Sequence, residues 1–189
     1  MDSFRKDIPM NRKSFAAVFI LSLVALACTW AQQPAQDKSK RPSPPGTADC
    51  TIKGKKVTIN YSRPSMKGRK IMGDLVPYGK VWRTGANEAT TLTTESDLTI
   101  GGAKVPAGTY TLYTLPAEGV WKLIINKQTG QWGTEYNQDQ DLARVAMTKT
   151  TIAVPVEQFT IALDQASNNS AELVMEWEKT RVSVPVTAQ

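Results

Sequence analysis

The chain of 189 residues contains no histidine. This absence excludes a Ser–His–Asp triad, a Cys–His dyad and any zinc, copper or non-haem iron site with imidazole ligands supplied by the chain. Acid–base chemistry would have to use Asp, Glu, Lys, Tyr or a group of the substrate. The run GRKIMG at 68–73 lacks the ending of a phosphate loop, and DQDL at 139–142 lacks the glycine and distal Glu of a calcium loop. We therefore expect no metal and no cofactor.

Cysteine is scarce, with Cys28 and Cys50 as the two examples. If Cys28 is removed or lipidated during export, Cys50 is alone and cannot form an internal disulfide. A catalytic cysteine needs an activating base or cation beside it. We therefore expect Cys50 to be a buried structural thiol near the start of the first strand.

Long apolar runs are also scarce, and the one candidate is Ser14–Cys28, which follows Arg12 and Lys13. A basic start, a short apolar stretch and small residues before a cleavage point are typical of a secretory signal peptide. We assign residues 1–31 to it, with Met10 as an alternative start because Asp2 and Asp7 are unusual before such a signal. The run is shorter than the ~20 residues of a membrane-spanning helix, and we expect no transmembrane segment.

Two cleavage points fit this signal peptide. Cleavage after Ala31 would release the protein to the periplasm or the medium. Cleavage before Cys28 would allow lipidation and tether the protein to the outer membrane. The lipoprotein pattern normally has Leu and then a small residue before this cysteine, whereas here Ala25 and Leu26 stand in the reverse order. We therefore expect an exported, untethered protein, with the lipoprotein as the alternative.

Charge is modest, at +6 for the whole chain, and is not concentrated as in a nucleic-acid-binding protein. Residues 32–49 are rich in Pro, Ser, Gln and Lys, a composition typical of a disordered linker. Residues 50–189 are enough for one domain with a real core. We predict a single domain over that range, with no nucleic-acid partner.

Short runs with alternating apolar residues follow the linker. Val57, Ile59 and Tyr61 alternate, as do the large side chains of 121–125, 159–163, 173–177 and 182–186, with turn sequences such as Gly101-Gly102 between runs. This pattern predicts an all-β fold, an antiparallel β-sandwich or a jelly-roll-like barrel with little helix. A short helix fits only at 139–147. The alternation slips between Leu112 and Tyr113, which indicates either a β-bulge or a strand buried on both faces.

One irregular run, Tyr61–Thr94, is too rich in Gly, Pro and cations for a plain strand and too rich in aromatics for a linker. Its sequence YSRPSMKGRKIMGDLVPYGKVWRTGANEAT, with PAGTYTL, VWKLIINKQTGQWG and the terminal WEKTRVSVPV, resembles the bacterial family known as domain of unknown function 2911. The resemblance spans nearly the whole predicted domain. It implies an exported, β-rich domain of Gram-negative bacteria, and it implies no activity.

The same run contains the candidate site. Arginine binds carboxylate or phosphate through two parallel hydrogen bonds, and an aromatic floor can hold a sugar ring. We expect a long ordered loop that forms a ligand site from Arg63, Arg69, Tyr78, Trp82, Arg83 and Asn87. An alternative is that these side chains only pin the loop to the scaffold. Asn87 also fits a tight turn after Gly85, and 131–136 could form a second rim, with Trp132 either at the ligand or flat on the scaffold.

Two carboxylates in this run, Glu88 and Asp74, are the candidate catalytic pair if the protein is an enzyme, because paired carboxylates hydrolyse glycosidic bonds without histidine. We favour a non-enzymatic binding module whose ligand is a small anion, a glycan or a peptide end. The alternatives are a histidine-free hydrolase and a structural envelope protein.

Overall fold

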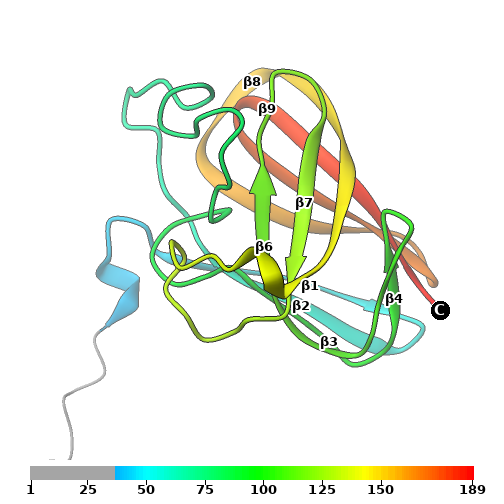
Figure 1. The fold of residues 1–189 in the computed structure, drawn as a ribbon. Coiled ribbons are helices and arrows are strands. Elements are labelled where there is room, and N and C mark those ends of the chain that lie inside the picture. Colours follow the sequence, from blue (N-terminus) through cyan, green and yellow to red (C-terminus); the bar gives the residue numbers. More distant parts are fainter. Residues whose placement is uncertain (1–36) are drawn as a thin grey trace, which may run out of the picture. The chain divides into compact units, whose positions relative to one another are not determined.

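The sheet is the main feature of the computed structural model, which describes residues 37–189. Its nine antiparallel strands lie in the order β1-β2-β3-β6-β7-β8-β9-β4-β5 (Figure 1). The described elements are the 3₁₀ helices η1 (Lys38–Lys40) and η2 (Gln138–Gln140) and the strands β1 (Pro45–Ile52), β2 (Lys55–Ser62), β3 (Thr91–Thr94), β4 (Leu98–Ile100), β5 (Ala103–Val105), β6 (Gly108–Leu115), β7 (Trp121–Asn126), β8 (Asp141–Ser167) and β9 (Ser170–Ala188). The predicted all-β class is confirmed. The predicted signal peptide lies outside the described residues.

Two long strands bend the sheet around its core. The first part of β8, up to Met147, pairs with β7, and from Thr148 onward β8 pairs with β9. The chain leaving β2 returns to β8, where the Met66 N–H donates to the Glu157 carbonyl at 2.8 Å and the Phe159 N–H to the Pro64 carbonyl at 2.9 Å. The sheet therefore folds over on itself as in a sandwich but does not close into a barrel.

The core follows the alternation seen in the sequence. Trp121, Leu123 and Ile125 of β7 are buried, as are the alternating apolar residues of β2, the second half of β8, and β9. Burying these faces removes apolar surface from water, which stabilises the fold by about 25 cal/mol for each Å² that is buried. The strand phases predicted from the sequence are thus confirmed where one face is buried.

Two predicted boundaries differ from the structure. The region 139–147 was expected to hold a short helix, but after η2 the chain enters β8, because Val145 and Met147 alternate inward and the segment pairs with β7. The first strand begins at Pro45, inside the segment expected to be linker, and pairs along its whole length with β2.

The phase slip in β6 reflects burial on both faces. Tyr110 to Thr114 are all buried, and the pairing of β6 with β3 and β7 shows no register shift, so no bulge is present. Tyr110 and Leu112 face the core, whereas Thr111 and Tyr113 are covered by the segment 127–140. The Thr111 hydroxyl donates to the Gln128 carbonyl at 2.7 Å.

The irregular segment 63–90 connects β2 and β3 on the side of the sheet away from the C-terminus (Figure 1). It is held by single bridges: Ser65 pairs with Gln158, Trp82 with Thr114 of β6, and Glu88 with Trp132 of the segment 127–140. The expected long ordered loop is confirmed. These bridges bring the two irregular segments together beside β6.

Candidate functional site

A cavity of about 380 Å³ lies where the irregular segments 63–90 and 127–140 meet β6 and β9. Two of its lining residues are arginines, and none of the described lining residues is Asp or Glu. The lining comprises Ser43, Pro64, Arg69, Leu75, Val81, Trp82, Arg83, Gly85, Ala86, Tyr113, Gly133, Thr134, Tyr136 and Trp177. A cavity with cationic side chains and no carboxylate favours an anion.

Trp82 forms a fixed wall. Its backbone exchanges two hydrogen bonds with Thr114, at 2.8 and 3.0 Å, so the residue is held as if it extended the sheet. Its ring stacks on Trp177 with centroids 5.9 Å apart and meets Phe159 edge-on at 5.0 Å. Aromatic pairs of this kind are worth about 0.5–1.5 kcal/mol beyond the area that they bury. The wall therefore exists before any ligand arrives.

Arg83 follows Trp82 directly and has an unusual environment. Its side chain is partly buried, and burial lowers the pKa of the guanidinium. Within the described part of the chain the guanidinium makes no hydrogen bond and no ion pair. Gly133 leaves room for it: a Cβ there would lie 2.9 Å from Arg83 Cδ and 2.9 Å from the Asn87 carbonyl oxygen. The fold thus leaves space for the Arg83 side chain, but the described residues give its guanidinium no hydrogen-bond partner.

Arg69 is partly satisfied. Its Nε donates to the Met66 carbonyl at 3.0 Å and its Nη2 to the Ser65 carbonyl at 2.7 Å. These bonds fix the guanidinium and leave Nη1 without a partner among the described residues. Arg69 can therefore add one donor and a positive charge to the cavity.

Tyr113 and Tyr136 also line the cavity, and the centroids of their rings lie 4.9 Å apart. The Tyr113 hydroxyl donates to the Glu135 carbonyl at 2.9 Å. The Tyr136 hydroxyl donates to Asp141 Oδ2 at 2.6 Å and accepts from Arg144 Nη2 at 2.7 Å. Burial, together with the hydrogen bond to Asp141, raises the pKa of Tyr136 to about 12. These hydroxyls are engaged within the protein, so the tyrosines offer the cavity mainly their rings.

The turn after Arg83 has positive φ at Gly85 and Asn87, as its sequence predicts, and also at Thr84. Thr84, Gly85 and Asn87 have φ of 54°, 146° and 59°. The Asn87 side chain donates to the Ser43 carbonyl at 3.1 Å and to the Ser62 hydroxyl at 3.3 Å. Asn87 therefore has the turn conformation that its position after Gly85 predicts, and it does not line the cavity.

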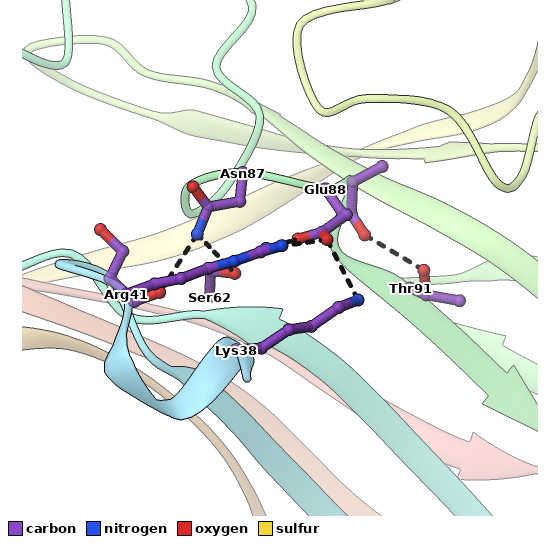
Figure 2. A network of polar contacts seen from close by, with 8 residues as sticks. Lys38, Arg41, Ser62, Asn87, Glu88 and Thr91 are labelled. Atoms are coloured by element: carbon purple, nitrogen blue, oxygen red, sulfur yellow. Dashed lines mark hydrogen bonds and ion pairs between the residues drawn. The ribbon is translucent and has the colours of Figure 1, made fainter. Parts of the chain in front are cut away.

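Glu88 lies in an ion-pair network outside this cavity (Figure 2). Arg41 Nη1 donates to both of its carboxylate oxygens, at 2.9 and 3.0 Å, and Lys38 Nζ lies 3.1 Å from Oε1. The bond from Arg41 is the largest cause that lowers the pKa of Glu88 to about 2. Glu88 is thus ionised at neutral pH and lines a separate hollow of about 200 Å³.

The remaining predicted residues lie elsewhere. Arg63 donates to the Phe159 carbonyl at 3.3 Å and to the Thr160 hydroxyl at 3.0 Å, which ties the irregular segment to β8. The Tyr78 ring lies 5.8 Å from Lys149 Nζ. Asp74 is exposed, and its backbone N–H closes a turn onto Ile71. None of these residues lines the cavity.

Of the predicted site residues, the structure thus brings together Arg69, Trp82 and Arg83. Sequence reasoning missed Tyr113 and Trp177, which are read as ordinary strand residues. Of the predicted second rim, Gly133 and Tyr136 line the cavity, whereas Trp132 is 45% exposed and does not. The described residues contain no group of three or more His, Cys, Asp and Glu side chains placed to hold a metal ion.

The fold and the cavity define an all-β domain with an arginine-lined pocket at one side of its sheet. The chain belongs to the family described as protein of unknown function (DUF2911), whose profile matches residues 43–186. Neither the curated proteins nor the solved structures contain a match to this chain. Between Asp37 and the C-terminus, no helix is long and apolar enough to cross a membrane.

Proposed function

We propose that this protein is a non-enzymatic binding module for a small anionic ligand, which it holds in the arginine-lined cavity. The observation that carries this proposal is Arg83. A guanidinium can make five hydrogen bonds, and a partly buried one that makes none costs folding free energy. A small anion would supply the partner that the described part of the protein does not.

The rest of the lining supports the same proposal. Arg69 adds a second positive charge, and no described carboxylate in the lining competes for either guanidinium. The aromatic walls restrict the ligand to one with a flat or apolar portion beside its charge, a description that includes acidic sugars. Because Trp82 and Tyr136 are held by protein contacts, little ordering entropy is lost on binding.

The hydrolase alternative has less support. Its general acid would need a carboxyl group that is protonated near neutral pH, whereas the pKa of Glu88 is lowered to about 2. Glu88 lines the smaller hollow, and Asp74 lines neither hollow. We therefore propose a role for Glu88 in holding the segment before β1.

We also propose that the domain acts after export, in the periplasm or outside the cell. The signal-like sequence of residues 1–31 supports this proposal. Mass spectrometry of the protein from separated periplasmic, membrane and cytoplasmic fractions tests it. A mature N-terminus at Gln32 is expected, whereas a diacylated Cys28 would make it a lipoprotein and an unprocessed cytoplasmic chain would contradict export.

The binding proposal is tested with Arg83→Gln against Lys80→Gln. Both changes remove one positive charge from the same irregular segment, but Lys80 is exposed and lies outside the cavity lining. Wild type and both variants are screened by thermal shift against carboxylates, phosphates and acidic sugars. We expect ligand-dependent stabilisation in wild type and Lys80→Gln and its loss in Arg83→Gln. An Arg83→Gln variant that is itself strongly destabilised, with no ligand found for wild type, would instead favour a structural role.

A further inference from the structure

The turn beside Arg83 has a second unsatisfied feature. Gly85 and Ala86 are buried and line the cavity, yet within the described part of the chain neither backbone N–H donates a hydrogen bond. Buried backbone N–H groups are almost always paired in native proteins. Two consecutive unpaired donors beside an unpaired guanidinium therefore indicate a missing acceptor.

The direction of the Gly85 N–H follows from its neighbour. The Thr84 carbonyl accepts a hydrogen bond of 2.7 Å from the hydroxyl of Thr90, a fully buried residue. The peptide bond is trans, so its N–H points opposite to its carbonyl. The Gly85 N–H is therefore directed away from Thr90.

The other residues that line the cavity indicate which chemical group the ligand has next to its negative charge. Leu75 lines the cavity although it is a large apolar residue and 43% exposed. Pro64 and Val81 lie in the same lining. Arg83 is the lining guanidinium with no protein partner in the described chain, so it can offer two parallel N–H donors to one carboxylate, whereas the donors of Arg69 are partly used by the Met66 and Ser65 carbonyls.

From these observations we infer that the ligand is a monocarboxylate with an apolar group next to the carboxylate. The Arg83 fork and the N–H groups of Gly85 and Ala86 bind the carboxylate oxygens, and Leu75 contacts the apolar group. This inference rests on the proposed function and adds the class of ligand. A free apolar acid and the C-terminus of a peptide share this chemistry.

The test uses matched pairs of acid and amide. Hexanoate is compared with hexanamide, and N-acetyl-L-leucine with N-acetyl-L-leucinamide, by ¹H–¹⁵N NMR titration of the whole protein up to about 10 mM, where weak ligands are detected. Inorganic phosphate is titrated separately. We expect at least one acid to bind at least about tenfold more tightly than its amide, since one charge-assisted hydrogen bond accounts for that ratio. Preference for hexanoate indicates a free acid, and preference for N-acetyl-L-leucine indicates a peptide terminus.

The backbone donors have a readout that needs no mutation. On binding, the amide proton resonances of Gly85 and Ala86 should move downfield and their exchange with solvent should slow, while those of exposed Gly130 stay unchanged. Arg83→Gln should weaken binding by about 10- to 100-fold, the equivalent of one lost charge-assisted interaction, and Lys80→Gln should not.

Four results would overturn the inference. Amides that bind as tightly as acids would exclude carboxylate recognition. If an acid binds without any change in the amide resonances or solvent exchange of Gly85 and Ala86, these backbone N–H groups do not bind the carboxylate. Phosphate binding that depends on Arg83, without acid binding, would refute the ligand class and leave the proposed function standing. If no probe binds and Arg83→Gln unfolds the protein, both the inference and the proposed function fail.

Discussion

The roles assigned to two arginines of the irregular segment predict opposite effects on stability. Arg83 is partly buried and has no protein partner among the described residues, whereas Arg63 donates to Phe159 and Thr160. Replacement by Met keeps most of the apolar stem of either side chain and removes its charge and its donors. The pair therefore separates a residue kept for a ligand from a residue kept for the fold.

The hydrogen bonds that each arginine makes set the expected change in the free energy of unfolding. Arg63→Met removes two hydrogen bonds from a charged donor and should lower the free energy of unfolding by about 2 kcal/mol. Arg83→Met removes a partly desolvated charge that gains nothing from the protein, so the free energy of unfolding should stay the same or rise by up to about 1 kcal/mol. For a domain of this size, 1 kcal/mol corresponds to about 2–4 °C in Tm.

Urea denaturation followed by tryptophan fluorescence measures both changes, because Trp121 and Trp177 are buried and report on the core. The m-value must stay constant for the comparison to hold. If Arg83→Met lost about 2 kcal/mol while Arg63→Met was neutral, Arg83 would be a structural residue. The reasoning from its missing partners would then be refuted.

Three further predictions concern single residues. Glu88→Gln should lower the free energy of unfolding by about 1 kcal/mol at pH 7, the value for a solvent-screened ion pair. The folded pKa of about 2 lies below the ordinary 4.5, so this stabilisation is complete above pH 4.5 and is lost as the pH falls through 2. The difference from wild type in urea titrations should shrink over the same pH range. Gly133→Ala places a Cβ 2.9 Å from Arg83 Cδ and 2.9 Å from the Asn87 carbonyl oxygen, so it should displace the guanidinium and the turn, and calorimetry should show weaker binding of any ligand that wild type binds. Gly119→Ala is the matched control, because a Cβ there has no atom within 4 Å and its φ is not positive. Cys50 is buried, and burial raises the pKa of its thiol, so a thiol reagent should label it only when urea unfolds the protein; rapid labelling of the native state would contradict this assignment.

The fold could be predicted from the sequence because strands with one buried face alternate visibly. The prediction for 139–147 was wrong because Asp141 and Leu142 obscure the start of an alternation that becomes clear at Val145. Burial on both faces of β6 was one of two open interpretations, since nothing local shows that the segment 127–140 covers Thr111 and Tyr113.

The site could be predicted only in part. A cluster of arginines and aromatics indicated a region, and Arg69, Trp82 and Arg83 meet there. Sequence gives no indication that Arg63 would be tied to β8, or that Glu88 would pair with Arg41, which is 47 residues away. Which arginine stays unpartnered depends on long-range contacts, and these become visible only in the folded chain.

The length of β8 has a consequence for how the domain unfolds. This strand pairs with β7 at one end and with β9 along the rest, so it is shared by both parts of the folded sheet. Neither part can keep its pairing if the other loses this strand, which lies between its two partners along the chain as well as in the sheet. Unfolding should therefore be highly cooperative, and hydrogen exchange should give the central amides of β7 and β9 the same opening free energy, that of global unfolding.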